Sequence, residues 1–150
     1  MKRLATLLLI FTSIGLQGQS TNPKFNKALA DSLGADEYGM KMYTFVILKS
    51  KENTLDKKIK DSLMVGHMQN INKLADAGKL IVAGPMGQND KKYRGIFIFN
   101  TSDLKEAKSW VETDPSVKGG IFDVELFPWY GSAALPLYLK HHEEVEKTKF

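Results

Sequence analysis

The chain has 150 residues, 43% hydrophobic and 25% charged, which is the composition of one globular domain with its own core. It contains no cysteine, which excludes disulfides, thiol catalysis and cysteine-ligated metal sites. The formal net charge is +4, but the lysines are spread along the chain without interleaved aromatic residues, so they indicate a solvated surface and no nucleic-acid partner.

Residues 1–18 have the pattern of a secretory signal peptide. Lys2 and Arg3 form a positive start, an apolar run covers residues 4–16, and small and polar residues follow. This run is shorter than the ~20 residues of a membrane span. We therefore expect cleavage after Gly18, export to the periplasm or beyond the cell, and no membrane attachment of the mature protein. An uncleaved N-terminal anchor is the alternative.

The next segments predict an arm, a strand and a helix. Residues 19–39 are polar and contain glycines, with a short helical stretch at 24–33, and predict an N-terminal arm. Residues 42–48, rich in β-branched and aromatic side chains, predict a strand that is apolar on both faces. Residues 56–77 predict a helix capped by Thr54, in which Gly66 marks a bend or a close approach. Its apolar positions recur every four residues: Ile59, Leu63, His67, Ile71 and Ala75.

The second half predicts two more strands, a second helix, a fourth strand and a tail. Residues 80–83 predict a strand closed by a turn at Gly84-Pro85, and residues 95–99 a third strand. Ser102 is the expected cap of a second helix, which must end before Asp114-Pro115 because proline disfavours helical geometry in the preceding residue. Residues 121–127 alternate between apolar and acidic side chains and predict a strand with one wet face. Residues 131–150 are expected to form a C-terminal tail.

The order strand–helix–strand–strand–helix–strand predicts an α+β fold, the ferredoxin-like βαββαβ sandwich with a four-stranded antiparallel sheet. The first and third strands are then central and the other two are edges. Two helices cover only one face of such a sheet, so the apolar residues on the other face need a cover. A homodimer formed sheet against sheet is the simplest way to supply it.

Several short motifs occur in a recognisable order along residues 40–130. They are the mid-helix His67, the Gly78-Lys79-Leu80 entry into a strand that ends at Gly84-Pro85, Asp114-Pro115 and Pro128-Trp129. In this order and spacing the chain resembles the YciI-like family of YCII-related domains, in a longer, secreted variant. The resemblance implies dimers of the dimeric α/β-barrel kind, and a site pair that falls here on His67 and Asp114.

The residue types of this pair suit proton transfer. Histidine titrates near neutrality, and a carboxylate on one ring nitrogen leaves the other free to act as a base. The alternative is a packed helix histidine with Asp114 only capping a turn. Gly84-Pro85 and Asp114 are expected at the same edge of the sheet, whereas His67 reaches that edge only if its helix bends or begins later.

The function expected is a cofactor-independent acid–base enzyme of lyase or isomerase type. A non-catalytic ligand-binding or interaction module of the envelope is the alternative.

Other residues complete the predicted site. Gly84, Pro85, Arg94 and Tyr43 are the candidates for binding a small-molecule ligand or substrate, although surface charge for Arg94 and core packing for Tyr43 are the plainer interpretations. No metal site is expected at the adjacent histidines 141 and 142, because neighbouring residues on a helix point apart.

Overall fold

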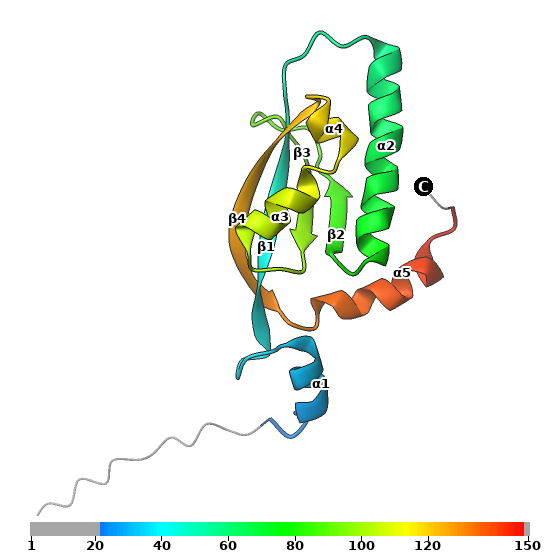
Figure 1. The fold of residues 1–150 in the computed structure, drawn as a ribbon. Coiled ribbons are helices and arrows are strands. Elements are labelled where there is room, and N and C mark those ends of the chain that lie inside the picture. The colour runs from blue at the N-terminus through cyan, green and yellow to red at the C-terminus, as the bar shows by residue number, and fades with distance from the viewer. Residues whose placement is uncertain (1–21, 149–150) are drawn as a thin grey trace, which may run out of the picture.

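The computed structural model describes residues 22–148 of the chain (Figure 1). The predicted leader, with its cleavage site, lies outside the described residues. Within them, no helix combines the length and the apolar character needed to cross a membrane. The elements in chain order are α1 (Lys27–Leu33), β1 (Met40–Ser50), α2 (Lys57–Asp76), β2 (Leu80–Pro85), β3 (Tyr93–Phe99), α3 (Leu104–Val111), α4 (Pro115–Lys118), β4 (Phe122–Ser132), η1 (Leu135–Tyr138) and α5 (Leu139–Val145).

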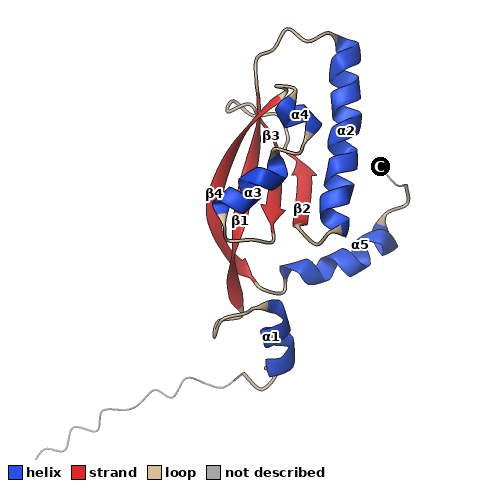
Figure 2. Ribbon diagram, viewed as in Figure 1, coloured by secondary structure: helices blue, strands red, loops and turns tan. Residues whose placement is uncertain are grey.

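The sheet confirms the predicted fold class. Its strand order is β2-β3-β1-β4, and each neighbouring pair is antiparallel. The central strands are therefore β1 and β3, as the apolar character of both their faces indicates. In Figure 2 the helices α2, α3 and α4 lie on one side of the sheet. This is the ferredoxin-like arrangement of one sheet layer and one helix layer.

The core is divided between the two faces of the sheet. Alternate residues of β1, Val46 and Leu48, face the helices and pack with Phe97 and Phe99. Tyr43 lies on the opposite face with Ile81 and Ile98. The C-terminal tail is part of this second cluster, since Leu135 and Leu139 pack against it.

The helix caps differ from the predicted ones by one or two residues. Asp56, not Thr54, caps α2, because its Oδ1 accepts from the Ile59 amide at 2.9 Å. Asp103, not Ser102, caps α3 and accepts from the Lys105 amide at 2.8 Å. In both cases a carboxylate stands closer to the first helical turn, where the free amides and the helix dipole favour an anionic acceptor.

Of two prolines expected at strand ends, Pro85 does end its strand, whereas Pro128 lies inside its own. Pro128 is inside β4 and pairs with Thr44, so β4 continues to Ser132 beyond the predicted end. Pro85 is the last residue of β2 and pairs with Gly95. Both prolines stand on edge strands, where a residue without an amide hydrogen can face away from the neighbouring strand.

Gly66 marks a close approach between α2 and Pro115. His67 reaches Asp114 without a bend in the helix. The helix α2 runs without a break from Lys57 to Asp76, and a Cβ placed on Gly66 would lie 2.8 Å from Cγ of Pro115. The missing side chain lets the start of α4 rest directly on the middle of α2. The expectation that His67 reaches the edge expected for Asp114 only if its helix bends or begins later is therefore wrong. The chain after α3 turns back over α2, in a short helix that the sequence analysis did not predict.

This contact gives the first prediction. Gly66→Val is expected to destabilise the fold by about 2 kcal/mol, because overpacking costs 1–3 kcal/mol while valine and glycine differ little in helix propensity. Urea unfolding measures the change. Pro115→Ala removes the Cγ that the valine meets, so the double variant should recover part of the loss. Additive effects of the two changes would contradict the contact.

Candidate active site

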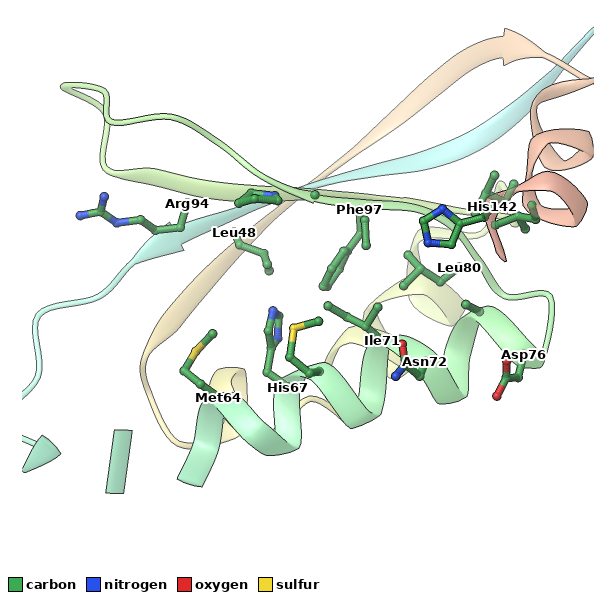
Figure 3. Close-up of a pocket in the computed structure, with 18 of the residues that line it drawn as sticks. Leu48, Met64, His67, Ile71, Asn72, Asp76, Leu80, Arg94, Phe97 and His142 are labelled. Carbon is green, nitrogen blue, oxygen red and sulfur yellow. The ribbon is translucent and has the colours of Figure 1, made fainter. Parts of the chain in front are cut away.

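A cavity of about 700 Å³ lies between α2 and the sheet. Figure 3 shows it with the helix along one side and the strands along the other. Its walls are mostly apolar, which is the character of a pocket for a small organic molecule. The apolar lining includes Leu48, Met64, Met68, Ile71, Leu80, Phe97 and Phe122.

His67 is a polar side chain set among these apolar walls. It projects from α2 toward the sheet (Figure 3) and is only 7% exposed. Its ring stacks on Phe97 at a centroid distance of 5.9 Å and meets Phe122 edge-on at 5.7 Å. The two aromatic rings fix the plane of the imidazole.

Asp114 holds the imidazole from behind the cavity. Its Oδ2 lies 2.6 Å from Nδ1 of His67, and the carboxylate has no exposed surface. Asp114 is the N-cap of α4, where its Oδ1 accepts from the Ser116 amide at 2.8 Å. It does not line the cavity, so His67 alone of the pair can touch a ligand.

Ser116 is a third, fully buried member of the group. Its hydroxyl donates to Oδ1 of Asp114 at 2.7 Å, and Oγ lies 3.2 Å from Nδ1 of His67. Sequence reasoning missed it. The available signal was the Asp-Pro-Ser sequence, which is typical of a capped helix start with proline in the first turn.

The charge state of the group follows from these contacts. Burial opposes the ionisation of Asp114, but the hydrogen bonds from His67 and Ser116 outweigh burial and hold the pKa of its carboxyl below the usual value. An ionised Asp114 accepts a hydrogen bond from the N–H at Nδ1 of His67. The neutral imidazole then carries its lone pair on Nε2, which forms no hydrogen bond with any described residue.

The remaining predicted site residues divide between the cavity and the core. Gly84, Pro85 and Arg94 line the cavity, with Arg94 at one end and its guanidinium directed outward (Figure 3). Tyr43 is fully buried on the other face of the sheet, where its hydroxyl donates to the Ser132 carbonyl at 2.8 Å. The structure thus places Tyr43 in the core, because residues 43 and 44 of a strand face opposite sides and the helix side belongs to Thr44.

The C-terminal segment also reaches the cavity, which sequence reasoning did not predict. Tyr138, Leu139, His142 and Glu146 lie in its wall. The adjacent histidines do point apart: His141 pairs with Glu144 at 2.9 Å on the outside of α5. Among the residues that the structure describes, no three potential metal-ligating side chains come together.

Comparison with known proteins finds a family whose model matches this chain. The family model described as "YCII-related domain" matches residues 42–130. Two curated relatives, each named Protein YciI, come from Escherichia coli O6:H1 and Shigella flexneri. Each is 28% identical to this chain over 89 residues, which cover 55% of this chain and 89% of the relative.

A solved structure is also similar to this chain. It is the 5-chloro-2-hydroxyhydroquinone dehydrochlorinase of Burkholderia phenoliruptrix in complex with 2,5-dihydroxybenzoquinone. The identity is 25%, the TM-score is 0.42, and the match covers 57% of this chain and 92% of that one.

Proposed function

Because this chain belongs to the family of YCII-related domains, as the match over residues 42–130 shows, we propose that it is a cofactor-independent acid–base enzyme of lyase or isomerase type. His67 takes a proton from, or gives one to, a small organic molecule in the cavity. Asp114 orients the imidazole and stabilises its charged form. Ser116 in turn fixes the carboxylate.

A single observation carries this proposal. The Nδ1 of His67 lies 2.6 Å from a buried carboxylate, while the same ring lines a cavity of about 700 Å³. A histidine that served only packing would not need an ionised partner without solvent exposure, since burying a charge is costly. The pairing fixes one tautomer, and that tautomer presents a basic nitrogen to the cavity.

The reaction can be written from this geometry. Nε2 of His67 takes a proton from a carbon or oxygen of the substrate, so the bond to hydrogen breaks and its electron pair enters the unsaturated system of the substrate. The imidazolium that forms is stabilised by Asp114. If the proton returns to a different atom, the product is an isomer. If the electron pair expels a leaving group, the product is that of an elimination, and the proton passes to water.

The walls indicate which substrates fit. Phe97, Phe122 and the methionines at positions 64 and 68 favour a flat, mainly apolar ring over a sugar or a polyanion. Arg94 stands at one end with its guanidinium directed outward, where it can attract an anionic group that projects from the cavity. The backbone at Gly84-Pro85 shapes the cavity edge without adding a charge.

Isotope exchange tests the proposal without knowledge of the true substrate. A base that removes a proton from carbon accelerates the exchange of that hydrogen for deuterium in heavy water. Unsaturated cyclic ketones, with cyclohexenone as the first probe, would be followed by proton NMR. The wild type should accelerate exchange of at least one probe, and His67→Gln should not.

The main alternative is a non-catalytic binding module, which the apolar lining also favours. In that case the probes would bind and show protection or line broadening, but their exchange rates would equal those in buffer. That result would reject the enzyme and retain the ligand site.

We also propose a homodimer formed through the free face of the sheet. Phe45, Ile47 and Ile96 are only half-buried there, and Phe127 is 44% exposed. The tail covers only the end of this face near Tyr43. We expect a dimer at micromolar concentration in analytical ultracentrifugation and a shift toward monomer in Phe127→Glu, because a desolvated charge opposes association. A monomeric wild type would refute this.

A further inference from the structure

The C-terminal segment is held against the domain as a wall of the cavity. The hydroxyl of Tyr138 donates to the Ile81 carbonyl on the edge strand β2. Leu135 and Leu139 pack into the cluster of Tyr43 and Ile81. Figure 1 shows α5 passing the edge of β2 close to the C-terminal end of α2. These contacts place the segment at the cavity, although it lies beyond the residues that match the family.

One face of this segment is directed at the cavity. Leu139, His142 and Glu146 all line it, and their spacing of three and four residues puts them on the same side. His141, one position away, lies outside this face and pairs with Glu144. Among the described residues, no side chain forms a hydrogen bond with the ring of His142, which is exposed at the cavity mouth.

His142 and His67 stand at separated places along the same cavity. In Figure 3 His142 lies beyond Phe97 and Ile71 from His67, at the end where Asn72 and Asp76 are found. The five residue steps along α2 from His67 to Asn72 span roughly 7.5 Å. The wall between these two positions is apolar. The cavity therefore offers two hydrogen-bonding positions with an apolar passage between them.

We propose that His142 is a second ligand-binding residue, and that the cavity takes a flat, apolar molecule with one polar group at His67 and a second, hydroxyl or carbonyl, at the opposite end against His142. This deepens the proposed function and rests on the same cavity. The domain shared with the family supplies the residue for proton transfer. The C-terminal segment then adds selection for the length of the ligand and for its remote polar group.

Two matched probes test this. The probes are 2,6-dihydroxynaphthalene, with a hydroxyl at each end, and 2-naphthol, which lacks the second one. Their binding would be measured from their own fluorescence. We expect the wild type to prefer the diol, and His142→Ala to weaken the diol about tenfold, the effect of one hydrogen bond, with 2-naphthol unchanged. The control is His141→Ala, which should change neither affinity.

The outcomes separate this inference from the acid–base proposal. Equal binding of the two probes by the wild type, an unchanged diol affinity in His142→Ala, or a loss shared by both probes would each overturn the role of His142. Thermal unfolding of the variant checks that the fold is retained, and His142→Gln, which keeps a donor, should recover part of the diol affinity. If the His142 effect is found and isotope exchange is not, the ligand site stands and the catalytic proposal falls.

Discussion

Asp114→Ala is expected to destabilise the folded protein by about 3–5 kcal/mol, the cost of breaking a buried, hydrogen-bonded pair. The carboxylate is fully buried and accepts from the Ser116 amide, the Ser116 hydroxyl and His67. Alanine removes all three acceptor contacts and the N-cap of α4 together. Urea or thermal unfolding of the variant measures the loss.

A surface cap provides the control. Asp56 has the same role at the start of α2, where it accepts from the Ile59 amide in an exposed position. Asp56→Ala should cost only about 1 kcal/mol, the usual value of a helix cap. Equal losses in the two variants would mean that Asp114 acts as a cap and nothing more.

The same carboxylate predicts a dependence of stability on pH. Its pKa is lowered in the folded protein, so its ionisation stabilises the fold above the unfolded value of 3.8. That contribution is lost as the pH falls through the lower, folded pKa. The difference in unfolding free energy between the wild type and Asp114→Asn should therefore decrease as the pH falls below about 4.

The strand order and the central strands were predictable from the sequence because their signal is local. Runs such as residues 42–48 are apolar on both faces, and only a central, covered strand accommodates that pattern. The same holds for α2, whose apolar positions recur every four residues. Its end at the Gly78 turn follows from one residue in the left-handed region.

The pairing of His67 with Asp114 came from family resemblance, and its physical basis was hidden in long-range contacts. The predicted strand order placed Asp114 at one edge of the sheet. It placed His67 too far along its helix to reach that edge. The short helix α4 brings them together. It is only four residues long and packs against α2 at Gly66, where the absence of a side chain leaves room for Pro115. A helix this short has no periodic pattern to detect. The Asp-Pro-Ser start, with Asp114 as the cap and proline in the first turn, was its only sequence signal.

The contribution of the tail was missed for a different reason. Residues 135–145 show little apolar periodicity. The charged residues after Tyr138 are typical of a solvent-exposed chain end. Their position depends on the edge of β2, where the Ile81 carbonyl accepts from Tyr138. An acceptor of that kind exists only once the sheet has formed, so no pattern within the tail itself could indicate it.

The two interpretations of His67 that the sequence left open are not exclusive. The side chain is 7% exposed and packed against two aromatic rings, so His67→Ala is expected to cost at least the ~1–3 kcal/mol of a core truncation, and more because it leaves the buried Asp114 carboxylate without one partner. A loss of stability in His67→Ala is therefore expected whether or not His67 acts as a base. A variant that keeps its volume and its donor is needed.

His67→Gln is that variant, and it should reduce isotope exchange by about 10²–10⁴-fold, the usual contribution of a general base. The glutamine amide can still donate to Asp114, so the fold and probe binding should be nearly unchanged, but it has no basic nitrogen. His141→Gln, on the outer face of α5, is the matched control and should leave the rate alone.

Asp114→Asn completes the test because it changes the tautomer. An asparagine can still accept from Ser116 while its amide donates to Nδ1 of His67, which moves the ring proton to Nε2, the nitrogen that must be free. The expected result is a folded protein that binds the probes and exchanges almost as slowly as His67→Gln. Full activity in this variant would show that the carboxylate does not set the tautomer, and would leave His67 without the partner on which its role as a base depends.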